Sequence, residues 1–343
     1  MLKEFIKEIR IRRKSATTLQ FKDRSQNIIK GSIATFEKIN VNGINHTLLI
    51  RGISIKNPIL LFLHGGPGCS EMGLTRNFNS ELEKHYVVVN YDQRGACKSY
   101  SKDLKKETMN MNQFLDDLVK IINYLQKRFK KKKVYLMGHS FGSMLGTLAV
   151  KNYPQLFHAY IGVAQATNMR LSEKIAMKFL LTKAIGSKNK AVIKLFKKIQ
   201  PIREDNPKAY LKKLQIMKKF MKLFGGSLYK QKDFAKLSRV LISSREYTIK
   251  EILRYDKCNE FCLECLWPEM LEINFIRDVK EVKMPFYIIQ GRHDYQTTYS
   301  LAKIFYQQLK APKKKFFTFE NSAHNPHYEE PERFNQIVIS LKK

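Results

Sequence analysis

The sequence lacks several features that would assign it to other classes of protein. No run approaches the roughly 20 consecutive apolar residues of a membrane-spanning helix, and the N-terminal stretch MLKEFIKEIRIRRKSATTLQ is charged throughout. Because that stretch has no apolar core typical of a secretory signal, we expect a cytoplasmic protein. Cysteine is scarce, with five in 343 residues. An odd number in a chain of this length argues against a scaffold held by disulfides.

Three of the cysteines, Cys258, Cys262 and Cys265, stand close together in the stretch CNEFCLEC. Three thiolates could bind zinc, but the spacing is unusual for a zinc site and no fourth ligand lies nearby in the sequence. We favour free thiols packed on a helix, and we expect no metal site.

Acidic residues are also scarce. The chain has 63 lysines and arginines against 30 aspartates and glutamates, a formal net charge of +33. Such an excess attracts nucleic acid or an anionic membrane when it is gathered on one surface. Here the lysines are dispersed along expected helices and are not interleaved with aromatic residues, as a base-stacking surface would require. We therefore interpret them as solvated charge, with weak attraction to anionic surfaces at most and no specific nucleic-acid partner.

The chain does contain a regular alternation of short apolar runs and amphipathic stretches. The runs are typical of buried strands, and the stretches have apolar residues at helical spacing. An Asn42-Gly43 pair between two alternating segments predicts a hairpin. This alternation indicates an α/β fold with a mostly parallel sheet that is covered on both faces. The expected strands are 59–63, 86–91, 134–137, 160–164, 284–291 and 315–320, and the expected helices are 111–129, one from 141, 300–310 and 331–342.

The alternation is interrupted between about residues 168 and 270. Segments there, such as AVIKLFKKIQ, carry apolar residues on one face and lysines on the other, as amphipathic helices do. We expect residues 168–270 to form a helical cap, or lid, inserted into a core built from residues 31–167 and 271–343. Residues 1–30 are basic and weakly patterned, and we expect them to form an N-terminal arm.

The stretch YLMGHSFGSMLG contains the first candidate for chemistry. Gly138, Ser140 and Gly142 form the pattern G-x-S-x-G between an expected strand and an expected helix. A sharp strand-to-helix turn leaves no room for side chains beside the serine, and the helix directs its free N–H groups toward it. Ser140 is therefore the candidate nucleophile, whereas an ordinary turn serine is the alternative.

A serine hydroxyl needs a base to accept its proton and an acid to orient that base. His324 and His327 both lie on the loop after the last expected strand, and the small residues before His324 favour it as the base. The acid should follow the preceding strand, which selects Asp294. Asp92 also follows a strand, but Arg94 stands close by in the sequence as a salt-bridge partner, so we interpret Asp92 as structural.

A glycine-rich loop, HGGPG at residues 64–68, follows the expected strand 59–63. Its glycines allow the backbone to approach a ligand closely. A negatively charged oxygen that develops on a reacting carbonyl requires two N–H donors, one from this loop and one from the residue after the nucleophile. We assign these donors to Gly66 and Phe141.

Taken in order, the stretches HGGPG, DQRG, GHSFGS, GRHD and SAHNPHYEEPERF resemble the proline iminopeptidase-like branch of the α/β-hydrolases. The resemblance covers about residues 33–166 and 270–343 and is weak through the expected cap. It implies an α/β-hydrolase fold with an eight-stranded, mostly parallel sheet, a helical cap inserted after the sixth strand, no cofactor, and hydrolysis of a peptide or ester bond. It also supports the roles assigned to Ser140, His324, Asp294, Gly66 and Phe141.

The sequence departs from this branch at two places. Cys97 stands where the family usually has glycine, in the turn DQRGACKS. Members of the branch hold the α-amino group of the substrate with glutamates, whereas here Tyr295 follows Asp294 and the expected cap has no matching glutamate motif.

The stretch FCLECLWPEMLEINF contains glutamates that can take the place of those of the family. Candidates for substrate binding are Gly65, Gln165, Glu264 and Glu269, with Glu272 as a further acid in the same segment. Each glutamate is equally an ordinary surface residue of a helix. A lysine-rich cap is also a poor host for an ammonium group, because like charges repel.

These observations favour a serine hydrolase that forms an acyl-enzyme intermediate. The first expectation is an aminopeptidase that acts on small peptides with a free N-terminus, in the manner of a proline iminopeptidase. The alternative is a carboxylesterase or amidase for small apolar acyl groups. A more distant alternative is a basic surface-binding protein whose hydrolase core is a relic.

Overall fold

The computed structural model of the chain describes residue 12, residues 14–230 and residues 232–342. Within these residues eight strands form one sheet in the order β1-β2-β4-β3-β5-β6-β7-β8. β1 pairs antiparallel with β2, and β2 with β4, whereas the other neighbours are parallel. The eight-stranded, mostly parallel sheet expected from the sequence is confirmed. The strands are β1 (Ile33–Val41), β2 (Ile44–Gly52), β3 (Ile59–Leu63), β4 (Val87–Asp92), β5 (Val134–His139), β6 (Phe157–Val163), β7 (Phe286–Gly291) and β8 (Lys314–Phe319).

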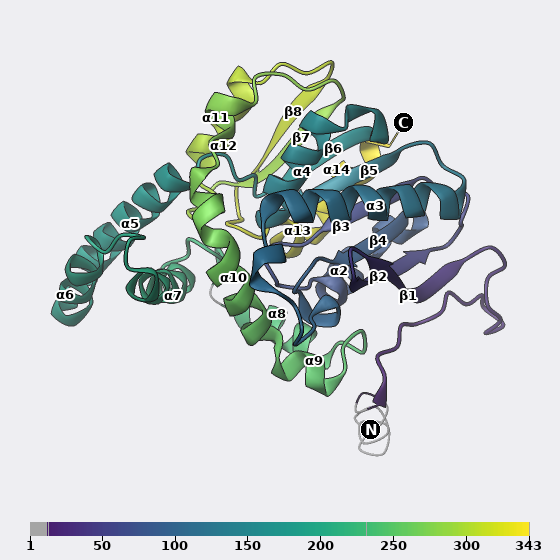
Figure 1. Ribbon diagram of the computed structural model, residues 1–343, viewed down its shortest axis with the longest axis horizontal. Coiled ribbons are helices and arrows are strands. Elements are labelled where there is room, and N and C mark those ends of the chain that lie inside the picture. The colour runs from purple at the N-terminus through teal and green to yellow at the C-terminus, as the bar shows by residue number, and fades with distance from the viewer. Residues whose placement is uncertain (1–11, 13, 231, 343) are drawn as a thin grey trace.

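Helices lie on both faces of this sheet (Figure 1). Phe334 and Val338 of the last helix pack in the cluster on one face, whereas Phe114 and Leu145, from two other helices, pack in the cluster on the opposite face. Apart from the helices within residues 169–272, the described α-helices are α2 (Met72–Phe78), α3 (Met111–Phe129), α4 (Phe141–Asn152), α11 (Phe275–Asp278), α12 (Tyr299–Gln308), α13 (Pro326–Glu329) and α14 (Pro331–Ser340).

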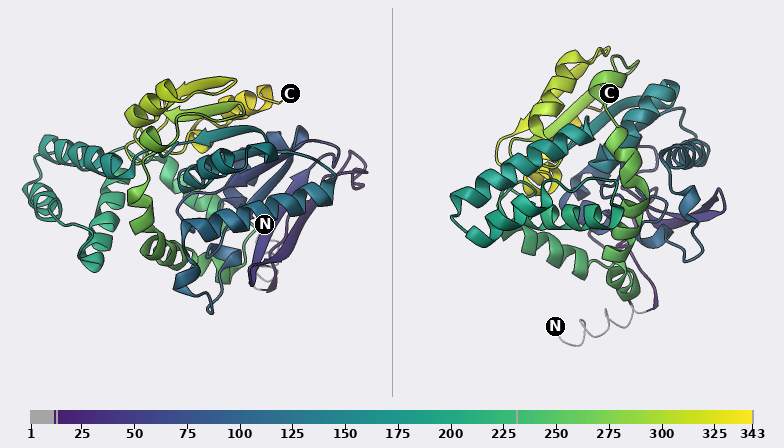
Figure 2. Two further views of the ribbon diagram at one scale, coloured as in Figure 1. Left: turned by 45° about the horizontal axis from the view of Figure 1, so that its top comes forward. Right: turned by 60° about the vertical axis from the view of Figure 1, so that its left-hand side comes forward.

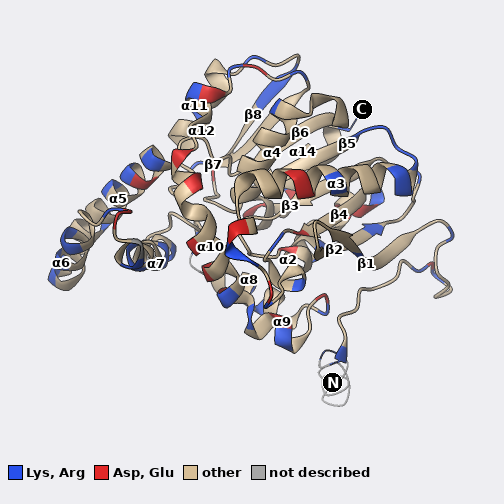
Figure 3. Cartoon of the chain, viewed as in Figure 1, with Lys and Arg blue, Asp and Glu red and all other residues tan. Residues whose placement is uncertain are grey.

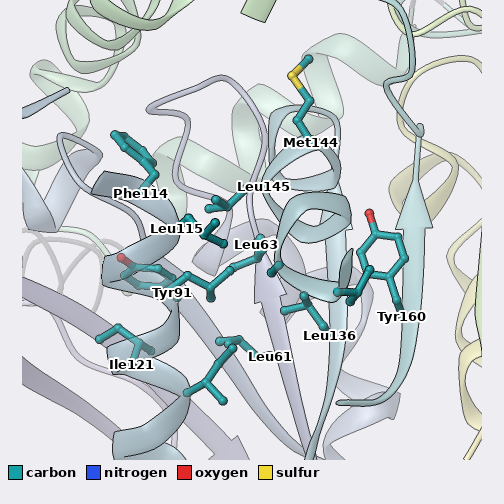
Figure 4. Packing of buried hydrophobic residues seen from close by; sticks show 14 of the residues in the cluster. Leu61, Leu63, Tyr91, Phe114, Leu115, Ile121, Leu136, Met144, Leu145 and Tyr160 are labelled. Carbon is teal, nitrogen blue, oxygen red and sulfur yellow. The ribbon is translucent and has the colours of Figure 1, made fainter. Parts of the chain in front are cut away.

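The central strands are apolar on both faces because both faces are covered. Successive side chains of a strand point to opposite sides of a sheet. Leu61 and Leu63 of β3 accordingly join the larger hydrophobic cluster, and Leu60 and Phe62 join the smaller one. Figure 4 shows the larger cluster, in which leucines of the sheet meet side chains of α3 and α4. This packing fixes the carboxyl ends of the parallel strands, where the candidate reactive residues stand.

The chain between β6 and β7 is helical, and we refer to Met169–Glu272 as the helical insertion. The expected cap, residues 168–270, falls on this segment. Figure 1 and Figure 2 show that α5, α6 and α7 extend outward from one end of the sheet, while α10 lies between them and the core. The helices are α5 (Met169–Gly186), α6 (Lys190–Ile199), α7 (Pro207–Leu223), α8 (Lys232–Ser243), α9 (Ile249–Leu253) and α10 (Tyr255–Glu272).

Local sequence signals explain where the helices of the insertion begin and how they pack. Asn168, Asn189 and Asn206 each precede a helix, and each side chain accepts a hydrogen bond from a backbone N–H of the first turn, as N-cap residues do. The helices α5, α6 and α7 then share a hydrophobic cluster of their own, which includes Leu180, Phe196, Met217 and Met221. In contrast, Cys262, Leu266 and Met270 of α10 belong to the larger cluster of the core.

The expected N-terminal arm, residues 1–30, lies partly outside the described residues. In the part that is described, the N–H of Thr17 donates to the carbonyl of Arg245 at 2.9 Å, and Arg51 donates to the carbonyl of Leu19 at 2.6 Å. This segment therefore contacts both the core and the insertion. Among the residues that the structure describes, no helix has the length and apolar character needed to cross a membrane.

The buried guanidinium of Arg94 pairs with Asp117 of α3. Its two hydrogen bonds to that carboxylate measure 2.7 and 3.0 Å, and both side chains are almost fully buried. The sequence-based expectation that Arg94 pairs with Asp92 is therefore wrong. The carboxylate of Asp92 instead accepts the N–H of Lys98 at 2.9 Å. The pair joins the turn after β4 to α3, and Asn42 of the hairpin also donates to Asp117, at 2.6 Å.

Replacing Asp117 with alanine should lower the free energy of unfolding by about 3–5 kcal/mol, because it leaves the charge of Arg94 buried without a partner. Urea denaturation measures this loss. Asp116→Ala is the matched control: it removes a neighbouring, exposed carboxylate of the same helix, and we expect a change of about 0.5 kcal/mol or less. Equal losses in the two variants would contradict the assigned role of the buried pair.

Candidate active site

Ser140 occupies a strained turn between β5 and α4. Its backbone has φ 52° and ψ −115°, a conformation that residues other than glycine rarely adopt. The glycines on either side are required by close contacts. A Cβ on Gly138 would lie 2.3 Å from the carbonyl oxygen of Gly142, and a Cβ on Gly142 would lie 2.2 Å from that of Leu63. The turn thus leaves Ser140 at the carboxyl end of the sheet, where it lines a pocket.

The structure brings Ser140, His324 and Asp294 together although they lie far apart in the sequence. The Oγ atom of Ser140 is 2.9 Å from Nε2 of His324, and Nδ1 of that histidine is 3.0 Å from Oδ2 of Asp294. When Nδ1–H donates to the aspartate, Nε2 is left free to accept the serine proton. The rival acid, Asp92, contacts the backbone of Lys98 instead.

Asp294 is held by several donors in addition to His324. Gln290 and the hydroxyl of Thr297 each donate to Oδ2 at 2.8 Å. The backbone N–H groups of Gln296 and Thr297 donate to Oδ1 at 2.8 and 3.0 Å. A buried carboxylate with this many donors has one orientation, and it therefore fixes the ring of His324.

The loop after β3 passes directly over the serine. A Cβ on Gly65 would lie 3.1 Å from the Cβ of Ser140, and Gly66 lines the same pocket as Ser140. Phe141 is the first residue of α4, so its N–H has no acceptor inside the helix. The two expected N–H donors, Gly66 and Phe141, therefore belong to the two backbone segments that flank Ser140.

A buried carboxylate, Glu71, connects these segments. Its Oε1 atom accepts the N–H of Gly65 and Nδ1–H of His139, both at 2.8 Å. Its Oε2 atom accepts the hydroxyl of Tyr328 at 2.6 Å and Nε2–H of His327 at 3.2 Å. Glu71 was not among the residues expected at the site, and His327, the rival base, contacts this carboxylate.

The protonation of Glu71, His139 and His327 depends on their burial and on the charges that they carry. Burial opposes ionisation of Glu71, but the attraction of His139 and the hydrogen bonds from both histidines outweigh it and hold its pKa well below the ordinary value. Burial alone would lower the pKa of His139, but the attraction of Glu71 and its hydrogen bond outweigh burial, so the pKa of His139 is raised. Burial and repulsion from His139 lower the pKa of His327 to about 3. These shifts favour an imidazolium at His139 beside the carboxylate of Glu71, and a neutral imidazole at His327.

The imidazolium of His139 has a second partner. Its Nε2 atom lies 3.0 Å from the backbone carbonyl of His324. Because both ring nitrogens carry protons in the charged form, His139 donates to Glu71 and to the histidine loop at the same time. Glu71, His139 and His327 also lie close enough together to hold a metal ion. However, the hydrogen bonds among them already account for these short distances.

A cavity of about 770 Å³ lies over Ser140, between the core and the helical insertion. Its apolar lining includes Met144, Met169, Leu263 and Trp267. Most of the charged lining comes from two helices: α7 contributes Lys218, Lys219 and Lys222, and α10 contributes Asp256, Glu260 and Glu264. Glu173 of α5 also lines the cavity, and it pairs with Lys213 at 2.7 Å. A volume of this size is in the range of pockets that enclose small-molecule ligands.

The expected substrate-binding residues lie in different environments. Glu264 lines the pocket, but its carboxylate pairs with Lys106 at 2.7 Å. Glu269 accepts the N–H of Met111 at the start of α3, and Glu272 pairs with an arginine, Arg170. Neither of these two glutamates is among the lining residues.

Gln165 is fully buried and takes part in an internal network. Its side chain donates to the carbonyl of Ala166 at 2.7 Å, and its backbone N–H donates to Oε1 of Gln290 at 2.8 Å. Gln290 in turn donates to Asp294. Gln165 therefore supports the orientation of Asp294 from inside the core, and it does not line the pocket.

The cysteines of α10 pack against the loops of the site. A Cβ on Gly68 would lie 2.7 Å from the carbonyl oxygen of Cys258 and 2.9 Å from Sγ of Cys262. Burial raises the pKa of Cys262 well above its ordinary value, so the thiol is unreactive. Cys97, which stands where the family usually has glycine, has a φ of 25°, in the left-handed region that favours glycine.

Comparison with known proteins identifies the family. The sequence model of the alpha/beta hydrolase fold family matches residues 58–331. A Bacillus subtilis (strain 168) protein described as "Probable aminopeptidase YbaC" is 33% identical over 309 residues, which cover 89% of this chain and 95% of that protein. A "Proline iminopeptidase" of Heyndrickxia coagulans is 23% identical over 320 residues, covering 90% of this chain and 95% of that protein.

Among solved structures, the proline iminopeptidase of Mycobacterium smegmatis superposes with a TM-score of 0.63 at 18% sequence identity. The match covers 89% of this chain and 97% of that protein, and it shows a shared fold. The chain therefore belongs to the α/β-hydrolase fold family, in its proline iminopeptidase-like branch.

Proposed function

We propose that this hydrolase acts through Ser140 as nucleophile, His324 as general base and Asp294 as the acid that orients the base. The observation that carries the proposal is the continuous chain of contacts, 2.9 Å from the serine to the histidine and 3.0 Å from the histidine to the aspartate. Nucleophile and base at this separation are typical of acyl transfer. The strained turn at Ser140 supports the same role.

In this mechanism, Oγ of Ser140 attacks the carbonyl carbon of the substrate while Nε2 of His324 accepts its proton. The N–H groups of Gly66 and Phe141 stabilise the oxyanion of the tetrahedral intermediate. The imidazolium then protonates the leaving group, and an acyl-enzyme remains. Water, deprotonated by His324, attacks the acyl-enzyme and releases the acid and the free serine.

We infer that the substrate is a short peptide with a free N-terminus and that the helical insertion forms a cap over it. The aminopeptidase and proline iminopeptidase names of the relatives support this inference. So do two carboxylates of α10 that line the pocket, Asp256 and Glu260. Among the described residues neither forms an ion pair, in contrast to Glu264. They are four positions apart and lie on one face of the helix, where both can contact an ammonium group.

An esterase or amidase that acts on small apolar acyl groups is the second candidate. The apolar part of the pocket, with its methionines and Trp267, favours it because such side chains bind an acyl chain without selecting for charge.

Turnover of proline p-nitroanilide and of p-nitrophenyl butyrate, measured side by side, tests the reaction and the substrate class together. We expect cleavage of the anilide that is abolished when its amine is blocked. Ser140→Ala should lower turnover by roughly 10³-fold or more. Cleavage of the ester alone would favour the esterase, and activity that survives in Ser140→Ala would exclude the proposed nucleophile.

The amine site can be tested by removing the charges of α10. In the double variant Asp256→Asn, Glu260→Gln, we expect KM for proline p-nitroanilide to rise about tenfold or more, since charge-assisted hydrogen bonds to the ammonium group are lost. KM for the uncharged butyrate ester should stay unchanged. Glu272→Gln, on the same helix but outside the pocket lining, serves as the control. A similar effect on both substrates would contradict an amine site.

Glu71→Gln tests whether the buried ion pair positions the reacting groups. Because the pKa of His139 is raised, its contribution to stability is complete below the ordinary histidine pKa and is lost as pH rises through the raised value. The free energy of unfolding should fall over this range in the wild type, and the fall should be smaller in Glu71→Gln because the contribution of His139 is lost; the part that comes from other groups of raised pKa, such as Cys262, remains. We also expect kcat to drop on the order of 10²-fold, because the loop after β3 and the loop after β8, which Glu71 holds, would shift.

Urea denaturation and steady-state kinetics between about pH 6 and pH 10 supply both readouts. Tyr328→Phe is the matched control, because it removes one hydrogen bond from the same carboxylate without changing a charge. It should retain the pH dependence of the wild type. If Glu71→Gln retains that dependence as well, His139 is not charged in the folded protein.

A further inference from the structure

The two helices that flank the pocket carry opposite charges. The helix α7 has six lysines and no acidic residue, whereas α10 has five acidic residues and one lysine. Figure 3 shows basic residues along α6 and α7 and acidic residues along α10. The lysines of the chain therefore do not all serve as solvated surface charge. Lys218, Lys219 and Lys222 line the cavity over Ser140.

Lys218 is held beside the loop that carries Gly66. Its Nζ atom donates to Oδ1 of Asn259 at 2.8 Å, and Nδ2 of that asparagine donates to the carbonyl of Pro67 at 2.6 Å. An amide oxygen neutralises no charge, so the ammonium group remains available to an anion. The chain of contacts also fixes Lys218 relative to the proposed oxyanion donors.

Lys222 lies one turn further along α7, on the same face as Lys218. It is half-buried, and its ammonium lies 4.1 Å from the ring centre of Phe234. Burial and repulsion from Lys218 lower its pKa, against the opposing attraction of Asp256. Among the described residues, neither lysine forms an ion pair. Two neighbouring ammonium groups without a carboxylate partner repel each other, and an anion that binds between them stabilises both.

We propose that Lys218 and Lys222 bind a carboxylate of the substrate, so that the pocket selects short peptides with a free C-terminus. This inference rests on the proposed peptidase function and adds to it. The carboxylates of α10 that line the cavity, Asp256 and Glu260, favour the ammonium end of the same molecule. A zwitterion matches both sets of charges, whereas a ligand with only negative charge is repelled by α10. The cavity of about 770 Å³ is large enough to enclose a small ligand at both ends.

Binding to the Ser140→Ala variant tests the inference without turnover. Calorimetry compares prolyl-glycine with prolyl-glycinamide, and alanyl-glycine with alanyl-glycinamide. Each pair differs only in the charge of the C-terminus. We expect the free acids to bind about tenfold more tightly or better, because a charge-assisted hydrogen bond accounts for about that factor.

The lysines themselves are tested in the same background by Lys218→Met together with Lys222→Met, which keeps the apolar stems and removes the charges. The preference for the free acid should disappear. Lys212→Met is the matched control, because Lys212 is exposed on α7 and does not line the pocket. Should the double variant fail to fold, single Lys222→Met and the salt dependence of the preference in the parent protein replace it. Added salt should weaken the preference by screening the charges.

Equal binding of acid and amide in the parent protein would overturn the inference, and so would a preference that survives the loss of both lysines. In either case, cleavage of proline p-nitroanilide by the wild-type protein would still support the proposed peptidase function. If none of the four peptides binds and the anilide is not cleaved, both the inference and the proposed peptidase function fail.

Discussion

The arrangement of the site depends on one buried carboxylate, that of Glu71. It lies beneath the turn that carries Ser140 and accepts hydrogen bonds from the loop after β3, from His139 and from the segment after β8. A buried charge is tolerated only when donors satisfy it and an opposite charge compensates it. The ion pair of Glu71 and His139 therefore holds these three segments together. Two of them carry the candidate nucleophile Ser140 and the candidate base His324.

Much of this site could be predicted from the sequence because its signals are local. Glycines on both sides of Ser140 mark a sharp turn, and Asp294 and His324 follow strands whose carboxyl ends meet at one edge of the sheet. Glu71 has no such signal, since its histidine partners, His139 and His327, stand 68 and 256 residues away. For Arg94, the sequence indicated a partner, but the wrong one. Proximity in the sequence favoured Asp92 as its partner, whereas packing of α3 brings Asp117 to it.

The helical insertion was less predictable than the core for a physical reason. Its helices follow from amphipathic patterns and asparagine caps, but which charged face borders the pocket depends on how the helices pack. A lysine-rich segment therefore suggested a poor host for an ammonium group. In the structure, five acidic residues of this segment lie on α10 and three of them line the cavity, which the lysines of α7 also border. Glu269, expected near the substrate, instead caps α3.

The helices α7 and α10, which both line the cavity, belong to different packing units. α10 packs in the core cluster, and Cys258 and Cys262 lie against Gly68 of the catalytic loop, whereas α7 packs in the separate cluster of α5–α7. The two units are nevertheless joined at the pocket, because Lys218 of α7 donates to Asn259 of α10 at 2.8 Å and the ring of Tyr295 stacks on Phe179 of α5, with ring centres 3.8 Å apart. A shift of the outer cluster that widened the cavity would therefore have to break these contacts. The width of the cavity is thereby coupled to the position of Tyr295, the residue that directly follows Asp294 in the sequence.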